Sequence, residues 1–127
     1  MQKRKLIYVL VAIIVIGIFY KIGIADSKNY IKVESVDQFN TLNKEPKVVI
    51  CFSAEWCGPC GPVKKSLESI SKQEKGIKFL IVDIDKLPSI SETYKIQLIP
   101  HIQVRKKFIQ GAHPQEKIHN FILKELQ

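Results

Sequence analysis

Two cysteines separated by two residues are the part of this sequence best suited to chemistry. Cys57 and Cys60 lie in EWCGPCGPVKK, residues 55–65, between the apolar run VVICFS and a helical pattern. Backbone N–H groups and the helix dipole at the start of a helix stabilise an anion, so we expect the first thiol to ionise more readily than a free cysteine. The Cys57 thiolate can then attack a disulfide, and Cys60 is close enough to resolve the mixed disulfide and release the reduced substrate.

The same spacing of cysteines also occurs in zinc sites, which is the main alternative. A closed zinc site needs four ligands. The other candidate ligands show no second paired spacing; they are Cys51, His101, His113 and His119. Disulfide chemistry is therefore favoured, and we predict neither a metal nor a cofactor.

The first 25 residues predict a targeting or membrane segment. Lys3, Arg4 and Lys5 precede an uninterrupted apolar run from Leu6 to Tyr20, and no acidic residue occurs before Asp26. A helix that is apolar on all sides is difficult to bury in a small domain. Because basic residues before the first apolar segment stay on the cytoplasmic side, we expect the rest of the chain to lie outside the cytosol.

Two fates of this segment are compatible with the sequence. A run of about fifteen apolar residues suits a signal peptide, and Gly23-Ile24-Ala25 is an acceptable cleavage site, so one outcome is a domain secreted after cleavage near Ala25. If the span covers residues 6–25, with Lys21 reaching the interface, it has the ~20 residues needed to cross a bilayer and stays as an anchor. The sequence leaves both outcomes open.

Length and composition allow one small domain after this segment. The chain has 127 residues, 46% of them apolar and 25% charged, an ordinary globular balance. The net charge of +8 partly reflects the basic residues before residue 26. The cluster Arg105-Lys106-Lys107 has no aromatic or glycine-rich partner, so we predict no nucleic-acid binding. The predicted organisation is a signal peptide or anchor over 1–25, a linker over 26–29 and a domain over 30–127.

The rest of the sequence alternates between strand patterns and helix patterns. Strands are expected at YIKV, VVICFS, KFLIVDID, HIQV and FIQ, the last two as an antiparallel hairpin around a basic turn. Helices are expected where capping or proline signals precede apolar periodicity. The first helix is opened by the capping pattern of Ser35 and Gln38, and the second carries Val63, Leu67 and Ile70 and ends near Gly76. The third is capped by Ser89 and Glu92. The fourth is opened by Pro114, and its inward-facing residues are Ile118, Phe121, Ile122 and Leu126. The predicted order is βαβαβαββα.

The segment AEWCGPC, residues 54–60, resembles the active-site signature of thioredoxins, and the resemblance extends from about Ile31 to Leu126. Members of that family have a central mixed β-sheet flanked by helices, so the resemblance implies an α/β protein with the thioredoxin fold, preceded here by the hydrophobic signal or anchor segment. A second match is Ile99-Pro100 after YKIQL. Members keep a cis proline there, packed beside the cysteines.

The resemblance implies protein-disulfide reduction, with Cys57 as the attacking thiol and Cys60 as the resolving thiol. A Gly-Pro pair between the cysteines is associated with reductases more than with oxidases or isomerases. The residues expected to contact the substrate are Trp56, Gly58, Pro59, Ile99 and Pro100. The expected partners are disulfide-containing protein clients, an upstream electron donor (a thioredoxin reductase or a membrane dithiol donor) and the membrane if residues 6–25 are retained.

Two buried positions depart from the family pattern. Members usually carry an aspartate six residues before the first cysteine, which helps the resolving thiol to lose its proton, and a lysine near it; this chain has Cys51 and Ile81. Replacing both partners of a buried charged pair by apolar residues can be neutral or stabilising, whereas losing one partner strands the other. We therefore expect a drier, more stable and slower site, in which Cys51 is a small buried apolar residue rather than a third redox thiol.

Two further departures lie close to the motif. His101 stands where most members have threonine after the cis proline, and the sequence leaves open whether it contacts substrate or lies on the surface. Gly61-Pro62 stands where members have larger helix formers. Proline is easily accepted in a first helical turn but not much further in. Either regular helix begins no earlier than about Gly58, which weakens the help that the helix gives to Cys57, or one backbone hydrogen bond is lost near the thiols.

Two other functions also fit the sequence. A disulfide oxidase or isomerase is one, because the compartment beyond a membrane is often oxidising. The other is a thioredoxin-fold subunit of a membrane assembly, with a mainly structural role in which the cysteines matter little.

Overall fold

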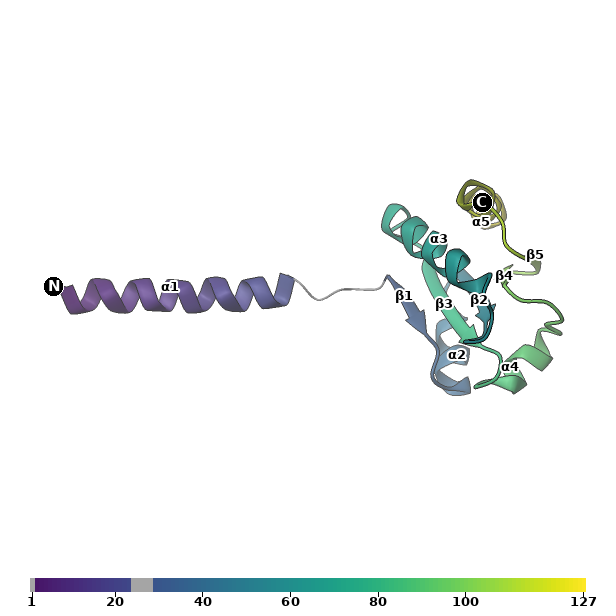
Figure 1. Cartoon of the computed structure of the whole chain (residues 1–127), viewed down its shortest axis with the longest axis horizontal. Coiled ribbons are helices and arrows are strands. Elements are labelled where there is room, and N and C mark those ends of the chain that lie inside the picture. The colour runs from purple at the N-terminus through teal and green to yellow at the C-terminus, as the bar shows by residue number, and fades with distance from the viewer. Residues whose placement is uncertain (1, 24–28) are drawn as a thin grey trace.

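The computed structural model of the protein describes residues 2–23 and 29–127, with side chains for 2–18 and 29–127 (Figure 1). The predicted cleavage site near Ala25 and most of the predicted linker lie outside the described residues. Helix α1, Gln2–Gly23, precedes the sheet domain, and its large apolar side chains between Leu6 and Ile18 are exposed. Within the described part of the chain, none of the helices combines the length and the apolar character needed to cross a bilayer.

A five-stranded mixed sheet forms the centre of the domain. The strands are β1 (Tyr30–Lys32), β2 (Val48–Ser53), β3 (Lys78–Asp83), β4 (His101–Val104) and β5 (Lys107–Gln110). Their spatial order is β1-β3-β2-β4-β5. Strands β1 and β2 both run parallel to β3, whereas β4 pairs antiparallel with β2 and with β5. All five predicted strands and the expected mixed sheet are therefore confirmed.

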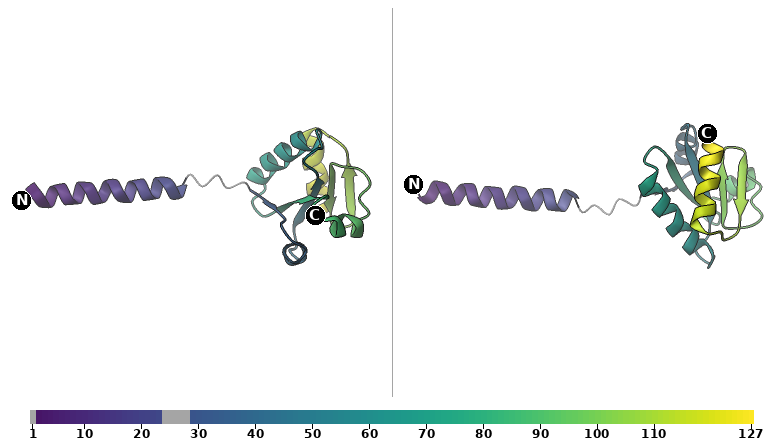
Figure 2. Two further views of the ribbon diagram at one scale, coloured as in Figure 1. Left: turned by 60° about the horizontal axis from the view of Figure 1, so that its bottom comes forward. Right: turned by 90° about the horizontal axis from the view of Figure 1, so that it is seen from above.

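Helices cover both faces of the sheet, as the two views in Figure 2 show. The helices are α2 (Val36–Leu42), α3 (Cys60–Gln73), α4 (Pro88–Thr93) and α5 (Gln115–Leu126). On one face, apolar residues of α3 and α5 pack on the sheet; they are Val63, Leu67, Ile70, Ile118, Ile122 and Leu126. On the other face, Phe39 of α2 and Ile90 of α4 pack on β2 and β3. The helices flank the sheet as predicted, and residues 30–127 follow the predicted order.

Strand β2 is buried on both faces, which explains its uninterrupted apolar sequence. All six of its residues are buried. Successive side chains of a strand point to opposite faces, so Val49 and Cys51 belong to the core under α3 and α5, while Ile50 and Phe52 belong to the core over α2 and α4. The strand thus ends inside the domain, immediately before the cysteine motif.

One of the two predicted helix caps is confirmed, and the other is wrong. The Ser35 side chain accepts a hydrogen bond from the Gln38 backbone N–H at 3.1 Å at the start of α2. Helix α4 instead has Leu87 at its N-cap, with no side-chain cap, and Pro88 is its first residue. Proline fits the first helical position because the N–H it lacks would have no partner there, so the helix begins before Ser89 can cap it.

The β4–β5 hairpin closes without a glycine in its turn. Val104 pairs directly with Lys107, so Arg105 and Lys106 form a two-residue turn. Arg105 adopts a left-handed conformation, φ 54°, which non-glycine residues rarely adopt. Its side chain donates a hydrogen bond to the Glu125 carbonyl at 3.1 Å, so the end of α5 helps to hold the turn.

Candidate active site

The two motif cysteines lie where β2 leads into α3, and they form a disulfide with each other. Their Cα atoms are 5.4 Å apart. The Cys57 N–H donates to the Ala54 carbonyl at 3.2 Å, and the Cys60 N–H donates to the Cys57 carbonyl at 3.3 Å. Cys57 keeps 9% of its surface exposed, whereas Cys60 keeps 0%. A disulfide in another protein can therefore approach Cys57 but not Cys60.

The position of Pro62 agrees with the sequence-based expectation. Helix α3 begins at Cys60, with Pro59 at the N-cap. Pro62 is then the third helical residue, where a missing N–H removes no intrahelical hydrogen bond. The prediction that regular helix begins no earlier than about Gly58 is confirmed. The positive end of the helix lies at Cys60, after Cys57 in the chain; the weaker activation of Cys57 stays a prediction.

Apolar residues enclose the disulfide from the domain side. The two cysteines and Ala54 form a small buried cluster, and the partly buried Ile84 and Ile99 pack against it. The Ile99–Pro100 peptide bond is cis, which confirms the expectation from the resemblance. Pro100 is buried. The cis bond therefore lies beside the disulfide, where Ile99 provides an apolar contact.

Exposed residues frame the disulfide on its solvent side. Trp56 is 69% exposed, and its indole N–H donates to Asp85 Oδ2 at 2.7 Å. Asp83 Oδ1 accepts a hydrogen bond from the Asp85 backbone N–H at 2.9 Å, which fixes the turn after β3. Gly58 and Pro59 are exposed as well. Asp85 was not among the site residues expected from the sequence, although the DID segment that carries it was recognised as part of a strand.

One ion pair lies next to this exposed surface. Lys86 Nζ is 2.9 Å from Glu55 Oε1. The Glu55 carboxylate raises the pKa of Lys86, through the hydrogen bond first and through its charge second. Both side chains are mostly exposed, so solvent screens the pair and it contributes little to stability.

Cys51 and Ile81 form an apolar pair beneath the site. The parallel register places Cys51 of β2 opposite Ile81 of β3, and Cys51 is completely buried in the core that includes Val63 and Leu67 of α3. Burial raises the pKa of the Cys51 thiol to about 12, and the charge of Lys64 lowers it to a smaller extent. Cys51 therefore stays a neutral thiol near pH 7, which confirms that it is a buried apolar residue.

His101 is buried, so the possibility of a surface histidine is wrong. Its exposed fraction is 2%, its Nε2 lies 2.9 Å from Gln103 Oε1, and its Nδ1 lies 3.3 Å from Gln110 Nε2. Because an amide oxygen accepts and an amide nitrogen donates, this pattern fits a neutral imidazole with its proton on Nε2. Burial lowers the pKa of His101, and the hydrogen bond to Gln103 raises it less.

Aromatic rings cover His101 on two sides. The Phe108 ring stacks on the imidazole with a centroid distance of 4.7 Å, and Phe52 meets it edge-on at 5.5 Å. Phe108, Gln103 and Gln110 were not among the site residues expected from the sequence. The predicted hairpin could have identified them, because alternate residues of two paired strands lie on the same face of the sheet. The register pairs residue 101 with 110 and residue 103 with 108, so these side chains are neighbours on one face.

The other candidate zinc ligands of the sequence analysis do not join the cysteine pair. In residues 2–23 and 29–127, no three histidine, cysteine or acidic side chains are grouped so that they could hold a metal ion. Cys51 is buried in the core, His101 lies in the polar network, and His119 Nε2 lies 2.9 Å from Glu74 Oε1. The chemistry that the geometry offers is that of the disulfide.

Comparisons with known proteins agree with this geometry. The family model described as Thioredoxin matches residues 30–124. The chain is 37% identical over 95 residues to Thioredoxin of Mycoplasmoides gallisepticum, covering 72% of this chain and 89% of that one. It is 29% identical over 105 residues to Thioredoxin H-type of Fagopyrum esculentum, covering 75% and 90%. A crystal structure of Malassezia sympodialis Thioredoxin is similar with a TM-score of 0.67 and 30% identity, covering 76% and 90%.

The apolar pair beneath the disulfide leads to a prediction about stability. Cys51→Asp buries a carboxylate without a partner, so we expect the free energy of unfolding to fall by about 3–5 kcal/mol. Ile81→Lys should recover part of this loss when combined with it, because residues 51 and 81 face each other in the register. Urea unfolding of the single and double variants measures the coupling. Cys51→Ala is the control without a charge, and losses that simply add would contradict the pairing.

The same double variant also tests the proton path. A carboxylate at residue 51 can accept the Cys60 proton, so we expect the pH dependence of turnover to change relative to the natural chain. An unchanged profile would contradict the idea that the missing carboxylate at residue 51 is what makes resolution by Cys60 depend on water or substrate groups.

The buried histidine leads to a prediction about pH. In the unfolded chain His101 binds a proton below its usual pKa of about 6.5, whereas the lowered pKa keeps it neutral in the folded protein. Stability should therefore be complete above that pH and fall as the pH decreases, by at most about 1.4 kcal/mol per pH unit. His101→Gln should remove this part of the decline in unfolding experiments from pH 7 downward. If the variant loses stability as steeply as the natural chain, the assignment is wrong.

Proposed function

The chain belongs to the thioredoxin family and is a protein-disulfide reductase of the thioredoxin type, and on that premise we propose that it reduces disulfides in protein clients on the non-cytosolic side of a membrane. The observation that carries the chemistry is the Cys57–Cys60 disulfide at the start of α3, in which Cys57 keeps some exposed surface and Cys60 keeps none.

The first step of the proposed reaction is attack by Cys57. In the reduced protein, the Cys57 thiolate attacks one sulfur of the client disulfide. A bond forms between Cys57 Sγ and that sulfur, and the second client sulfur leaves as a thiolate. The greater exposure of Cys57 supports this assignment, because the buried Cys60 cannot meet a sulfur of another protein.

The second step is resolution by Cys60. The Cys60 thiol loses its proton, and its sulfur attacks Cys57 Sγ, which releases the remaining client sulfur as a thiolate. The client gains two electrons, its two sulfurs leave as thiolates that take up one proton from Cys60 and one from the solvent, and the protein is left with the Cys57–Cys60 disulfide. Because Cys51 and Ile81 supply no base beneath the site, the Cys60 proton passes to water or to a departing client thiolate.

The client is proposed to dock on the surface around the disulfide. Trp56, Gly58 and Pro59 are exposed there, while Ile99 and the cis Pro100 lie on the side of the domain core. The hydrogen bond to Asp85 holds the Trp56 ring in one orientation. An extended client segment with apolar side chains fits this arrangement better than a charged one.

The proposed location rests on the first segment of the chain. Basic residues precede the apolar run that begins at Leu6, and the described apolar side chains of α1 up to Ile18 are exposed. Exposed apolar side chains on every side of a helix are stable in lipid rather than in water. The described residues contain no helix that meets the requirements for crossing a bilayer, so the anchor is proposed from the sequence of residues 6–25 as a whole, with the domain beyond the membrane; cleavage near Ala25 would release the same domain.

The direction of electron flow also requires a donor. A reductase beyond a membrane is oxidised at each turnover, so it needs a thioredoxin reductase or a membrane dithiol that restores Cys57 and Cys60. The reduction potential separates this function from an oxidase or isomerase, because the thioredoxin value of about −270 mV lies far below the −180 to −120 mV of isomerases and oxidases.

Trapping of clients is the direct test of the reductase function. Cys60→Ser keeps the attacking thiol but cannot resolve the mixed disulfide, so we expect client proteins to remain covalently attached to Cys57. Mass spectrometry after non-reducing electrophoresis identifies them. The variant with serine at both positions is the control. Absence of trapped proteins, together with normal cellular function of the double variant, would instead favour a structural subunit.

The fate of the first segment has its own test. We expect the natural full chain in a cell membrane to keep its complete mass and to resist alkaline carbonate extraction, since a spanning apolar segment is not released by loss of charge. A chain lacking residues 1–25 is the control and should be released. A mature product that begins at Asp26 would show cleavage and contradict the anchor.

A further inference from the structure

Basic side chains gather at the end of the sheet opposite the disulfide. Strands β2 and β3 begin side by side there, with Val48 paired to Lys78. The turn after β4 lies at the same end, because Val104 pairs with Val49. We call this set the basic end; its residues are Lys47, Lys75, Lys78, Arg105 and Lys106. The disulfide lies at the other end of β2, beyond Ser53.

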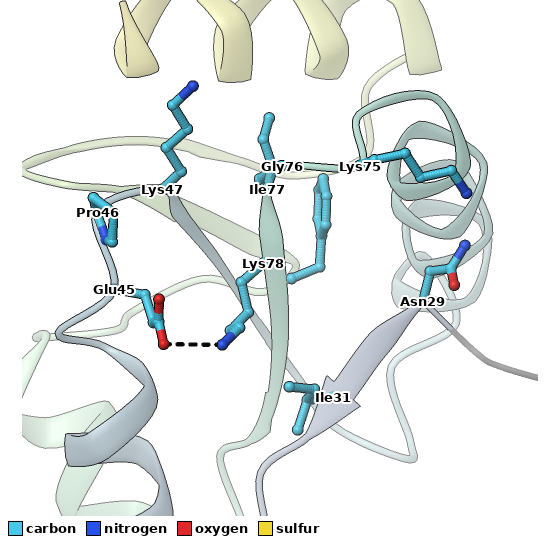
Figure 3. A pocket seen from close by; sticks show the side chains of 10 residues that line it. Asn29, Ile31, Glu45, Pro46, Lys47, Lys75, Gly76, Ile77 and Lys78 are labelled. Carbon is cyan, nitrogen blue, oxygen red and sulfur yellow. Dashed lines mark hydrogen bonds and ion pairs between the residues drawn. The ribbon is translucent and has the colours of Figure 1, made fainter.

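An open pocket occupies part of the basic end. Its volume is about 370 Å³, and its lining includes Asn29, Lys47, Lys75 and Lys78. Figure 3 shows these side chains around the starts of β1 and β3. Lys47 and Lys75 extend from loops on opposite sides of the pocket. The pocket therefore presents ammonium groups to whatever lies beyond this end of the domain.

The positive charge at the basic end is only partly neutralised. Lys78 Nζ lies 3.1 Å from Glu45 Oε1, and Glu74 is engaged with His119. Within the described part of the chain, Lys47 and Lys75 form no ion pair, and both are exposed.

The opposite end has no comparable excess of one charge. Glu34, Glu55 and Asp83 lie around one depression there together with Lys32, Lys64 and Lys86. The excess of basic side chains is therefore at the end away from the active site.

The chain enters the domain at the basic end. Asn29 lines the pocket itself, and residues 24–28 separate it from the end of α1. Six Cα–Cα steps join Gly23 to Asn29, so this connection spans at most about 22 Å. If α1 is held in a bilayer, the basic end is therefore kept within about three Debye lengths of the lipid surface at physiological salt.

We propose that the basic end binds anionic lipid headgroups of the membrane that holds the first segment. This inference rests on the anchor in the proposed function. Phosphate groups of the lipids meet Lys47 and Lys75, and the short connection favours this contact over binding of a soluble anion. The domain is then oriented with Cys57 directed away from the membrane, toward clients in the surrounding space.

Chemical footprinting of lysines tests the contact. The full chain is reconstituted in vesicles of phosphatidylcholine alone and in vesicles with about one third phosphatidylglycerol, and an amine-reactive acetylating reagent is added. We expect acetylation of Lys47 and Lys75 to be at least ~3-fold slower in the anionic vesicles, and the difference to vanish in high salt. Lys86, near the active site, serves as the internal reference and should react equally in both. Equal rates for Lys47 and Lys75 in the two vesicles would overturn the inference.

Matched variants show whether the lysines themselves make the contact. Lys78 lines the same pocket, so its acetylation should also be slower in anionic vesicles, and Lys47→Gln with Lys75→Gln should abolish that difference. Lys65→Gln with Lys95→Gln removes the same charge elsewhere and should preserve it. If both double variants keep the protection of Lys78, the basic end is not the contact and the inference is wrong.

Three readouts separate this inference from the proposed function. Release of the natural chain by alkaline carbonate would overturn the anchor, and this inference with it. If the chain stays in the membrane during carbonate extraction but acetylation of Lys47 and Lys75 is not slower in anionic vesicles, only the lipid contact is overturned. Disulfide reduction by the detergent-solubilised chain reports on the reductase independently of both.

Discussion

The complete burial of β2 is the constraint on which the rest of the domain depends. A strand covered on both faces must be apolar, and it needs helices on each side. Here α3 and α5 cover Val49 and Cys51, while α2 and α4 cover Ile50 and Phe52. Because the strand is fixed from both sides, the segment that follows it is fixed as well. The cysteine pair therefore lies at a defined place, partly buried and at the start of a helix.

The two facing core positions at residues 51 and 81 are apolar rather than a charged pair. Two facing positions, Cys51 and Ile81, are apolar and pack with α3 and α5. A buried charged pair would provide a base for Cys60, but it would also carry a desolvation cost that its attraction offsets only with good geometry. The apolar pair avoids that cost and leaves proton transfer to groups outside the core. The chain therefore combines the motif of a reductase with a core in which the pair Cys51 and Ile81 carries no charged group.

The region after the cis proline, in contrast, buries polar side chains. His101 is buried next to two glutamines, and each of its ring nitrogens meets an amide group of matching character. Phe108 stacks on this imidazole and remains 53% exposed, so an aromatic ring rather than a helix shields the polar group. A buried polar network is stable only when every member has a partner. This network satisfies that condition, and it ties β5 to the strand that follows Pro100.

The sequence by itself determined the strands, the helices and the cysteine pair, because each leaves a local pattern: apolar runs, capping residues, proline positions and the motif. The cis proline followed from the resemblance to the thioredoxin family rather than from a local pattern. Tertiary structure decided what local patterns cannot express. The cap of α4 moved to Leu87 because Pro88 begins that helix. The burial of His101 depends on partners from β5, and the partnership of Trp56 with Asp85 joins residues that are 29 positions apart. The basic end likewise forms only when strands that are distant in sequence begin side by side, since charge density depends on distance in space.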